Sequence, residues 1–196
     1  MKKFLTIVAI ATAVLFTGCK KTSDFNKYLI EDYEYVQSQY VGQEVVFYEA
    51  QITLNGSPVE LGKEAQPITV KEVFQVNDTV VFVNRDYTTK EVNVETVQGY
   101  WCEDVVVNPV GIVDYNDALK ALLSVKTIDV PDAVFVTLRN PLGPVAYENP
   151  FYIFGSTRTS FVAVDAKTLE IYDFSDKVVE SSLKESIVET TELTEE

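Results

Sequence analysis

Two runs of strand-forming residues joined by a two-residue turn constrain the fold more than any other feature of this chain. Residues 68–76 and 79–83 are rich in β-branched and aromatic side chains, and Asn77-Asp78 lies between them. Asparagine and aspartate accept the backbone angles of a tight turn, so the pattern predicts an antiparallel hairpin. A preceding strand-forming run, residues 45–54, ends at Asn55-Gly56, which is a strong turn signal in its own right.

The sequence around this hairpin extends the β pattern. Val92, Val94 and Thr96 alternate with polar residues, which predicts a strand with one dry and one wet face. Ahead of the first strand, apolar residues recur at helical spacing, at Phe25, Leu29, Tyr33, Val36 and Tyr40. The spacing predicts a helix, and an extended tyrosine-rich segment packed against a sheet is the alternative. We therefore expect residues 25–110 to form a β-rich region, an antiparallel meander that is largely hydrophobic on one side.

The second half of the chain adds a helix to further strands. Asp114 can cap a helix over residues 115–125. Strand-forming runs follow at 133–138, 151–154, 160–164 and 170–174, with a turn at 165–168. One helix on antiparallel strands is an α+β unit, which we assign to residues 111–175, and we detect no repeat of the first half. Residues 176–196 form an acidic tail, for which a marginal helix and a disordered segment both stay open.

The first 18 residues have the pattern of an export signal. Lys2 and Lys3 precede an uncharged run, residues 4–17, that is too short for a comfortable membrane span. Residues 15–19 (LFTGC) resemble the lipobox of bacterial lipoproteins. The resemblance implies cleavage before Cys19 and lipidation of its thiol, which would hold the chain at a membrane through residues 19–24 as a tether. An ordinary secretory signal is the alternative.

Lys20 follows the lipidation site, where lipoprotein sorting to the inner membrane favours aspartate. We therefore expect an outer-membrane anchor, with the protein facing either the periplasm or the cell surface. The formal net charge of −14 repels phosphates, so nucleic acid is not an expected partner.

The composition also limits the chemistry. The chain has no histidine, which excludes Ser-His and Cys-His hydrolase arrangements and histidine-based zinc sites. With Cys19 lipidated, Cys102 has no partner within the chain, and we interpret it as a buried side chain or as one half of an intermolecular disulfide. No phosphate loop, dinucleotide fingerprint or nucleophile elbow occurs, so we expect no cofactor.

Acidic pairs are the remaining material for catalysis or for calcium binding. They are Glu103-Asp104, Asp114 with Asp117, and Asp129 with Asp132. A glycosidase needs two carboxyl groups held across a cleft, and sequence spacing alone shows no such arrangement. We interpret these residues as surface charge or helix caps and expect no metal site.

A family resemblance covers residues 112–174. The helix of residues 116–122 (NDALKAL) and the later segment 161–168 (FVAVDAKT) resemble a PepSY-like domain, a small extracytoplasmic α+β module. Leu169 stands where that family has a glycine, so the usual turn chemistry is expected to change. The resemblance implies an α+β fold class, in which an antiparallel β-rich N-terminal part precedes a helix on an antiparallel sheet. It also implies a non-catalytic module, sometimes linked with protease or β-lactamase inhibition.

The proline-containing loop of residues 140–149 is the candidate partner-binding segment, and it displays Arg139, Tyr147 and Glu148. A rigid connection packed on its own domain is the competing interpretation. We predict a lipid-anchored, non-enzymatic binding module that has an unknown protein partner and could act as an enzyme inhibitor. An envelope-structural lipoprotein and a carboxylate-based glycoside hydrolase are the alternatives. A carbohydrate binder would need exposed coplanar aromatic rings, whereas Trp101, the one tryptophan, is expected to lie in a strand.

Overall fold

The computed structural model describes residues 25–57, 62, 65–101, 105–126, 128, 135–141, 147–155 and 161–174. Its elements are α1 (Phe25–Gln39), β1 (Val45–Leu54), β2 (Pro67–Val76), β3 (Thr79–Asp86), β4 (Val92–Gln98), α3 (Tyr115–Ser124), β5 (Phe135–Arg139), β6 (Phe151–Phe154), β7 (Phe161–Asp165) and β8 (Ile171–Phe174). The two helices and the individual strands predicted from the sequence are confirmed, with small shifts of their ends. Asp114 caps α3 as predicted, since its side chain accepts a hydrogen bond from the backbone N–H of Asn116.

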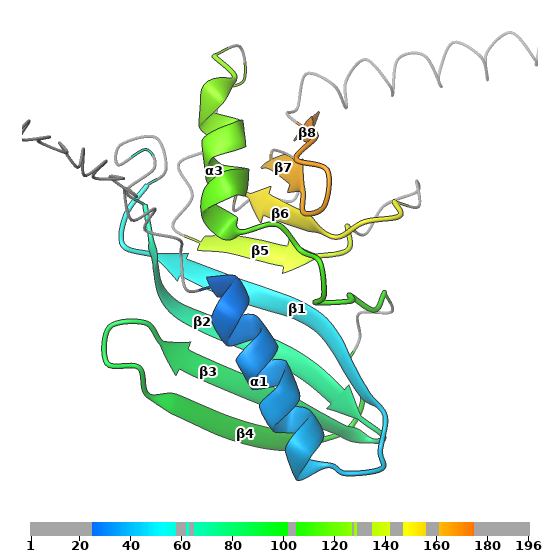
Figure 1. The fold of residues 1–196 in the computed structure, drawn as a ribbon. Coiled ribbons are helices and arrows are strands. Elements are labelled where there is room, and N and C mark those ends of the chain that lie inside the picture. The colour runs from blue at the N-terminus through cyan, green and yellow to red at the C-terminus, as the bar shows by residue number, and fades with distance from the viewer. Residues whose placement is uncertain are drawn as a thin grey trace, which may run out of the picture.

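The eight strands of the described residues form one antiparallel sheet in the order β4-β3-β2-β1-β5-β6-β7-β8 (Figure 1). Within each half, consecutive strands are neighbours, and the pairing of β1 with β5 joins the halves. The apolar residues Val45, Phe47, Ala50, Ile52 and Leu54 of β1 are buried, whereas Gln51 is exposed.

The predicted fold class is therefore wrong. The α+β prediction placed a separate PepSY-like unit of one helix on its own sheet in residues 111–175. Instead, β5–β8 continue the sheet that β1–β4 begin, and two short helices complete the described part, so the fold is mainly β. The reason is that the free edge of β1 is satisfied by β5, which merges the two predicted sheets into one.

Both helices pack on the same face of this sheet and meet over Tyr152 of β6. The Tyr152 ring contacts Phe25 of α1 at a centroid distance of 6.1 Å and Tyr115 of α3 at 6.0 Å, both edge to face. Its hydroxyl donates to the carbonyl of Val113 at 2.8 Å, and the Asn26 amide donates to the carbonyl of Ile112 at 2.7 Å. The start of α1 is thus tied to the segment that leads into α3. Neither helix is long and apolar enough to span a membrane, among the described residues.

The two halves repeat one arrangement of elements, a helix followed by a four-stranded meander. In the β1–β5 pairing, Gln51 lies opposite Thr137, flanked by Ala50 opposite Leu138 and by Ile52 opposite Val136. A two-fold rotation about the Gln51–Thr137 pair exchanges the halves. The expectation that no repeat relates them is wrong at the level of structure, because the repeat is carried by topology and by one turn rather than by extended sequence similarity.

That turn joins β7 to β8. The Asp165 carboxylate accepts hydrogen bonds from the backbone N–H groups of Lys167 at 2.7 Å and Thr168 at 2.8 Å. Leu169 then adopts a φ of +66°, the left-handed conformation that glycine favours. Leu169 thus takes a left-handed position in this turn without being a glycine.

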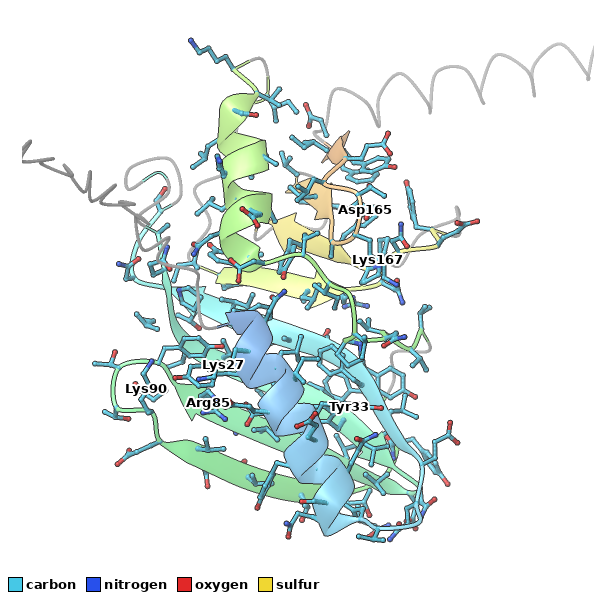
Figure 2. All side chains as sticks on the ribbon, viewed as in Figure 1. Lys27, Tyr33, Arg85, Lys90, Asp165 and Lys167 are labelled. Carbon is cyan, nitrogen blue, oxygen red and sulfur yellow. The ribbon has the colours of Figure 1, made fainter. Side chains whose placement is uncertain are left out.

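The β3–β4 turn has the same construction. The Asp86 carboxylate accepts from the N–H groups of Thr88 at 2.7 Å and Thr89 at 2.8 Å, and Lys90 has a φ of +66°. Figure 2 labels Lys90 in this turn and Asp165 in its counterpart. Each aspartate ends the third strand of its half, so the two turns occupy equivalent positions in the repeat.

One strand differs from its prediction. The alternation of Val92, Val94 and Thr96 predicts a dry face, but every residue of β4 is exposed. β4 lies at the end of the sheet, whereas α1 contacts β1, reaches β2 through Tyr33 and Phe74, and reaches β3 through Asp32 and Arg85. The alternating pattern is real, yet no described element covers the apolar side of this strand.

The two turn aspartates provide a test of the repeat. Burial raises the pKa of Asp165, but hydrogen bonds from Asn149, Lys167 and Thr168 outweigh that effect and lower it below the ordinary value. Asp165→Ala should lower the free energy of unfolding by about 1–3 kcal/mol at pH 7, because partly buried hydrogen bonds from the backbone N–H groups of Lys167 and Thr168 lose their charged acceptor. The effect should fade as the pH falls below about 4, where the unfolded chain also binds a proton.

Asp86→Ala is the matched control, because it removes the two equivalent hydrogen bonds from a more exposed turn, in which Asp86 is half-buried. Urea unfolding of both variants at pH 7 and pH 3 measures the difference. Equal losses for the two variants would contradict the role given to the burial of Asp165.

Candidate binding surface

The face of the sheet opposite the helices is not covered by any described element. Because side chains alternate across a strand, the pairing register assigns each strand residue to one face. One row on this open face runs across the sheet through Asn84, Lys71, Gln51, Thr137, Ile153, Ala163 and Tyr172. The row changes from polar on β1–β3 to apolar on β6–β8, so the open face has two parts of different chemistry.

The apolar part is a cluster of five aromatic side chains, hereafter the aromatic cluster. It consists of Tyr147, Phe151, Phe161, Tyr172 and Phe174. Phe151 is fully buried within it, whereas the other four side chains are half-buried. Phe135, which is 42% exposed, and Ile153 extend the apolar surface along β5 and β6.

The cluster depends on a small residue beneath it. Ala163 of β7 lies opposite both Ile153 and Tyr172, and its methyl side chain leaves room for rings from the flanking strands to meet. Phe151 and Tyr172 consequently stack at a centroid distance of 5.0 Å with planes 20° apart. Tyr147 closes the group, 5.0 Å from Phe151 and 5.8 Å from Tyr172.

This packing is unlike a carbohydrate-binding platform. Rings that stack on one another, such as Phe161 on Phe174 at 4.8 Å, cover their own faces and turn their edges outward. Sugar rings need the open faces of aromatic side chains. Trp101 does not supply one, because it follows β4 outside any strand and packs edge to face on Phe82 at 5.9 Å. The prediction that Trp101 lies in a strand is wrong.

The polar part of the open face is hollowed. A depression of about 730 Å³ lies over β1–β4, and its polar lining includes Gln51, Thr53, Thr69, Lys71, Asn84 and Asn93. Asp86 and Glu91 from the β3–β4 turn also border it. Amide, hydroxyl and ammonium groups line this hollow, so it can offer hydrogen bonds beside the aromatic cluster.

The residues predicted as a partner-binding site lie at the border of the aromatic cluster. Arg139 lies opposite Phe151 in the β5–β6 pairing, and it forms an ion pair with Glu49 at 3.4 Å. Tyr147 is a member of the cluster, and Glu148 beside it is exposed. Phe161, Tyr172 and Phe174 were not singled out from the sequence, because only strand pairing brings them together. The lipidation site Cys19 and the pairs around Glu103 and Asp129 lie outside the described residues, as does Cys102.

A second cluster of ionisable groups lies on the other face, beneath α1. Asp32 of α1 accepts two hydrogen bonds from Arg85 of β3, one from Nε at 2.8 Å. Arg85 also lies over the ring of Tyr28 at 4.3 Å, and Figure 2 shows it beside Lys90. Glu72 of β2 is 1% exposed, and neither of its carboxyl oxygens has a hydrogen-bond partner within the described residues.

This buried cluster perturbs the ionisation of Glu72. Burial, followed by the negative charge of Asp32, raises its pKa well above the ordinary value, and Arg85 lowers it only in part. A raised pKa inside a cleft would suggest an acid catalyst, but Glu72 faces the helix-covered core. We therefore assign a structural role to this cluster and do not assign it a role in binding a substrate.

The other acidic pair within the described residues, Asp114 and Asp117, belongs to a helix start. Asp114 caps α3, and Asp117 lies in the first turn of that helix, where negative charge meets the positive end of the helix dipole. Within the described part of the chain, no three histidine, cysteine, aspartate or glutamate side chains lie close enough to hold a metal ion.

Comparisons with known proteins add one similarity. No protein-family model matches the chain, and no curated protein does. Among solved structures, the chain is similar to a putative lipoprotein from Clostridium difficile 630, with 14% sequence identity and a TM-score of 0.47. The match covers 74% of this chain and 90% of that one. An identity and a TM-score this low carry no argument about function.

Glu72 gives a pH-dependent prediction. Between the pKa of an unfolded glutamate, about 4.3, and the raised pKa in the fold, the folded state holds one more proton. The contribution of Glu72 to stability is therefore complete below pH 4 and is lost as the pH rises, by up to about 1.4 kcal/mol per pH unit. Glu72→Gln should remove this slope and raise the free energy of unfolding at pH 8, measured by urea unfolding from pH 5 to pH 8.

Glu95→Gln, on the exposed strand β4, is the control and should leave the slope unchanged. An identical pH dependence in Glu72→Gln and the unsubstituted protein would show that Glu72 does not carry an excess proton in the fold.

Proposed function

We propose that this chain is a lipid-anchored, extracytoplasmic binding module without catalytic activity, and that the aromatic cluster contacts its protein partner. The observation that carries the proposal is the accumulation of half-buried aromatic rings on a sheet face that no described element covers. Tyrosine and phenylalanine are enriched in the central parts of protein interfaces, where large rings lose water at little cost in side-chain entropy.

The surroundings of the cluster favour a partner with basic groups. Glu148 and Glu170 are exposed at its border, and a hydrogen bond to Glu170 raises the pKa of Tyr172. The formal net charge of −14 adds a field of the same sign. An apolar patch with an acidic border is complementary to an apolar patch ringed by lysine and arginine. If the partner is a hydrolase, inhibition is the activity to assay first.

The lipobox-like residues 15–19 support anchoring at Cys19, and Lys20 favours an outer-membrane location. Because the lipid holds the N-terminus, the module acts at a membrane surface and meets partners there. Protease digestion of intact cells would distinguish a periplasmic from an external location, because only an external protein is accessible to the protease.

Tyr172→Ser should abolish capture of the partner, because it removes the ring that contacts Tyr147, Phe151 and Phe174. The mature chain, with Cys19→Ser to prevent lipidation, serves as bait against detergent-solubilised native membranes. A protein bound through the cluster should be retained by the unsubstituted bait and weakened at least about tenfold by Tyr172→Ser.

Tyr35→Ser is the matched control, since Tyr35 is 46% exposed on α1, on the opposite face of the sheet. It should retain the partner fully. Thermal unfolding of both variants separates lost binding from lost folding. Retention by a folded Tyr172→Ser variant, or equal loss with Tyr35→Ser, would remove the aromatic cluster from the proposed interface.

Cys19→Ser should release the chain from the membrane, because the serine hydroxyl does not replace the thiol in lipid transfer. Incorporation of an alkyne-labelled fatty acid and fractionation of the cells measure this. Cys102→Ser is the control and should stay labelled and membrane-bound. Unchanged membrane association of an unlabelled Cys19→Ser protein would contradict the anchor while leaving the binding surface untouched.

A further inference from the structure

Among the described residues, no strand pairs with the outer edge of β4, and the hydrogen bonds to β3 show which backbone groups point outward. The N–H of Asp86 donates to the carbonyl of Glu91 at 2.9 Å, and the N–H of Gly99 donates to the carbonyl of Asp78 at 2.6 Å. In an antiparallel ladder, hydrogen-bonded pairs recur at every second residue. Odd-numbered residues of β4 therefore bond to β3, and the N–H and C=O groups of the even-numbered residues 92–98 point outward.

This edge lacks the features that usually prevent strand addition. β4 has seven residues, with no proline, no lysine and no break in its pairing with β3. Its valines are exposed, Val92 by 42%, Val94 by 37% and Val97 by 54%. Edge strands are normally kept short or are protected by bulges, prolines and lysines. The opposite edge strand, β8, has four residues, so only β4 offers a long template.

We propose that β4 pairs with β4 of a second copy of this chain, antiparallel and with Val94 opposite Val94 of that copy. The two-fold axis of such a dimer passes through an outward-facing residue, which gives three hydrogen-bonded pairs and about six hydrogen bonds between the copies. The result is a sheet that continues from one copy into the next.

The sequence of β4 is self-complementary in this register. Val94 meets its own copy as a β-branched pair, and Val92 lies opposite Thr96 on the same face. On the other face, Asn93 lies opposite Glu95, and the Asn93 amide already donates to Glu95 within one chain, at 3.0 Å. A register centred on Glu95 would instead place two carboxylates directly opposite each other, which is unfavourable.

Two unfavourable effects limit the strength of this association. Seven residues of edge strand bury less surface than the roughly 800 Å² per partner of a stable interface. The net charge of −14 on each copy also repels the other, and salt screens this repulsion. The dimer should therefore be weak in dilute solution and should strengthen with salt.

Val94→Lys and Val97→Lys form a matched pair for the test. Both replace an exposed valine of β4 and change the net charge equally. Lysine at position 94 lies opposite itself and should weaken dimerisation at least about tenfold, whereas lysine at position 97 lies opposite Glu91 of the other copy and should preserve or strengthen it. Sedimentation equilibrium of the mature Cys19→Ser chain, up to millimolar concentration and at two salt concentrations, measures both.

Cross-linking tests the register independently. In a Cys19→Ser, Cys102→Ser background, Val94→Cys should form an intermolecular disulfide under mild oxidation, because opposed Cα atoms of a hydrogen-bonded pair lie about 5.5 Å apart. Val97→Cys should not, since residue 97 does not oppose its own copy. A chain that stays monomeric at every concentration, equal weakening by the two lysines, or preferential cross-linking through Val97→Cys would overturn the proposal.

Discussion

The pairing of β1 with β5 is the interaction on which the rest of the structure depends. It joins two four-stranded meanders into one sheet, with Gln51 opposite Thr137 at its centre. On one side of this seam, Ala50, Ile52, Val136 and Leu138 are completely buried beneath the helices. On the other side, the Glu49–Arg139 ion pair spans the same two strands. Separated, each half would expose the long edge of its first strand, and Tyr152 would lose its contact with Phe25 of α1.

The seam also determines which surface is free for binding. Because both helices start near the seam and pack on one face, the opposite face continues across the sheet without a covering element in the described residues. The buried cluster of ionisable residues lies on the helix-covered face. The Asp32–Arg85 pair and the unpartnered carboxyl of Glu72 are placed under α1, where they can only affect stability. The aromatic cluster lies where a partner can reach it, and this difference in access, more than any difference in residue type, separates the candidate site from the structural cluster.

Local signals in the sequence were sufficient for the elements but not for their assembly. Helical spacing from Phe25 and the cap at Asp114 predict α1 and α3, and the Asn77-Asp78 turn predicts the β2–β3 hairpin. The β1–β5 pairing joins residues more than 80 positions apart, and no periodicity encodes which edge a strand will use. The α+β prediction failed for that reason. For the site, Arg139 ends β5 and Tyr147 lies in the proline-containing loop that follows, which composition singles out. By contrast, Phe161, Tyr172 and Phe174 look like ordinary core residues until the register places them on the open face.

The proposed lipid anchor at Cys19 would place the two surfaces close to a membrane. Phe25 is fully buried against Tyr152, so the packed structure begins only six residues after Cys19. At the maximum rise of an extended chain, that interval spans about 20 Å. With a lipid on Cys19, the sheet is therefore confined to a thin layer above the membrane. Confinement of this kind raises the effective concentration of neighbouring copies, as a short linker does between two joined modules. The proposed pairing of two β4 edges, which is too weak to hold two copies together in dilute solution, would be favoured in that layer. The resulting dimer would present two aromatic clusters on one continuous sheet to a partner in the same membrane.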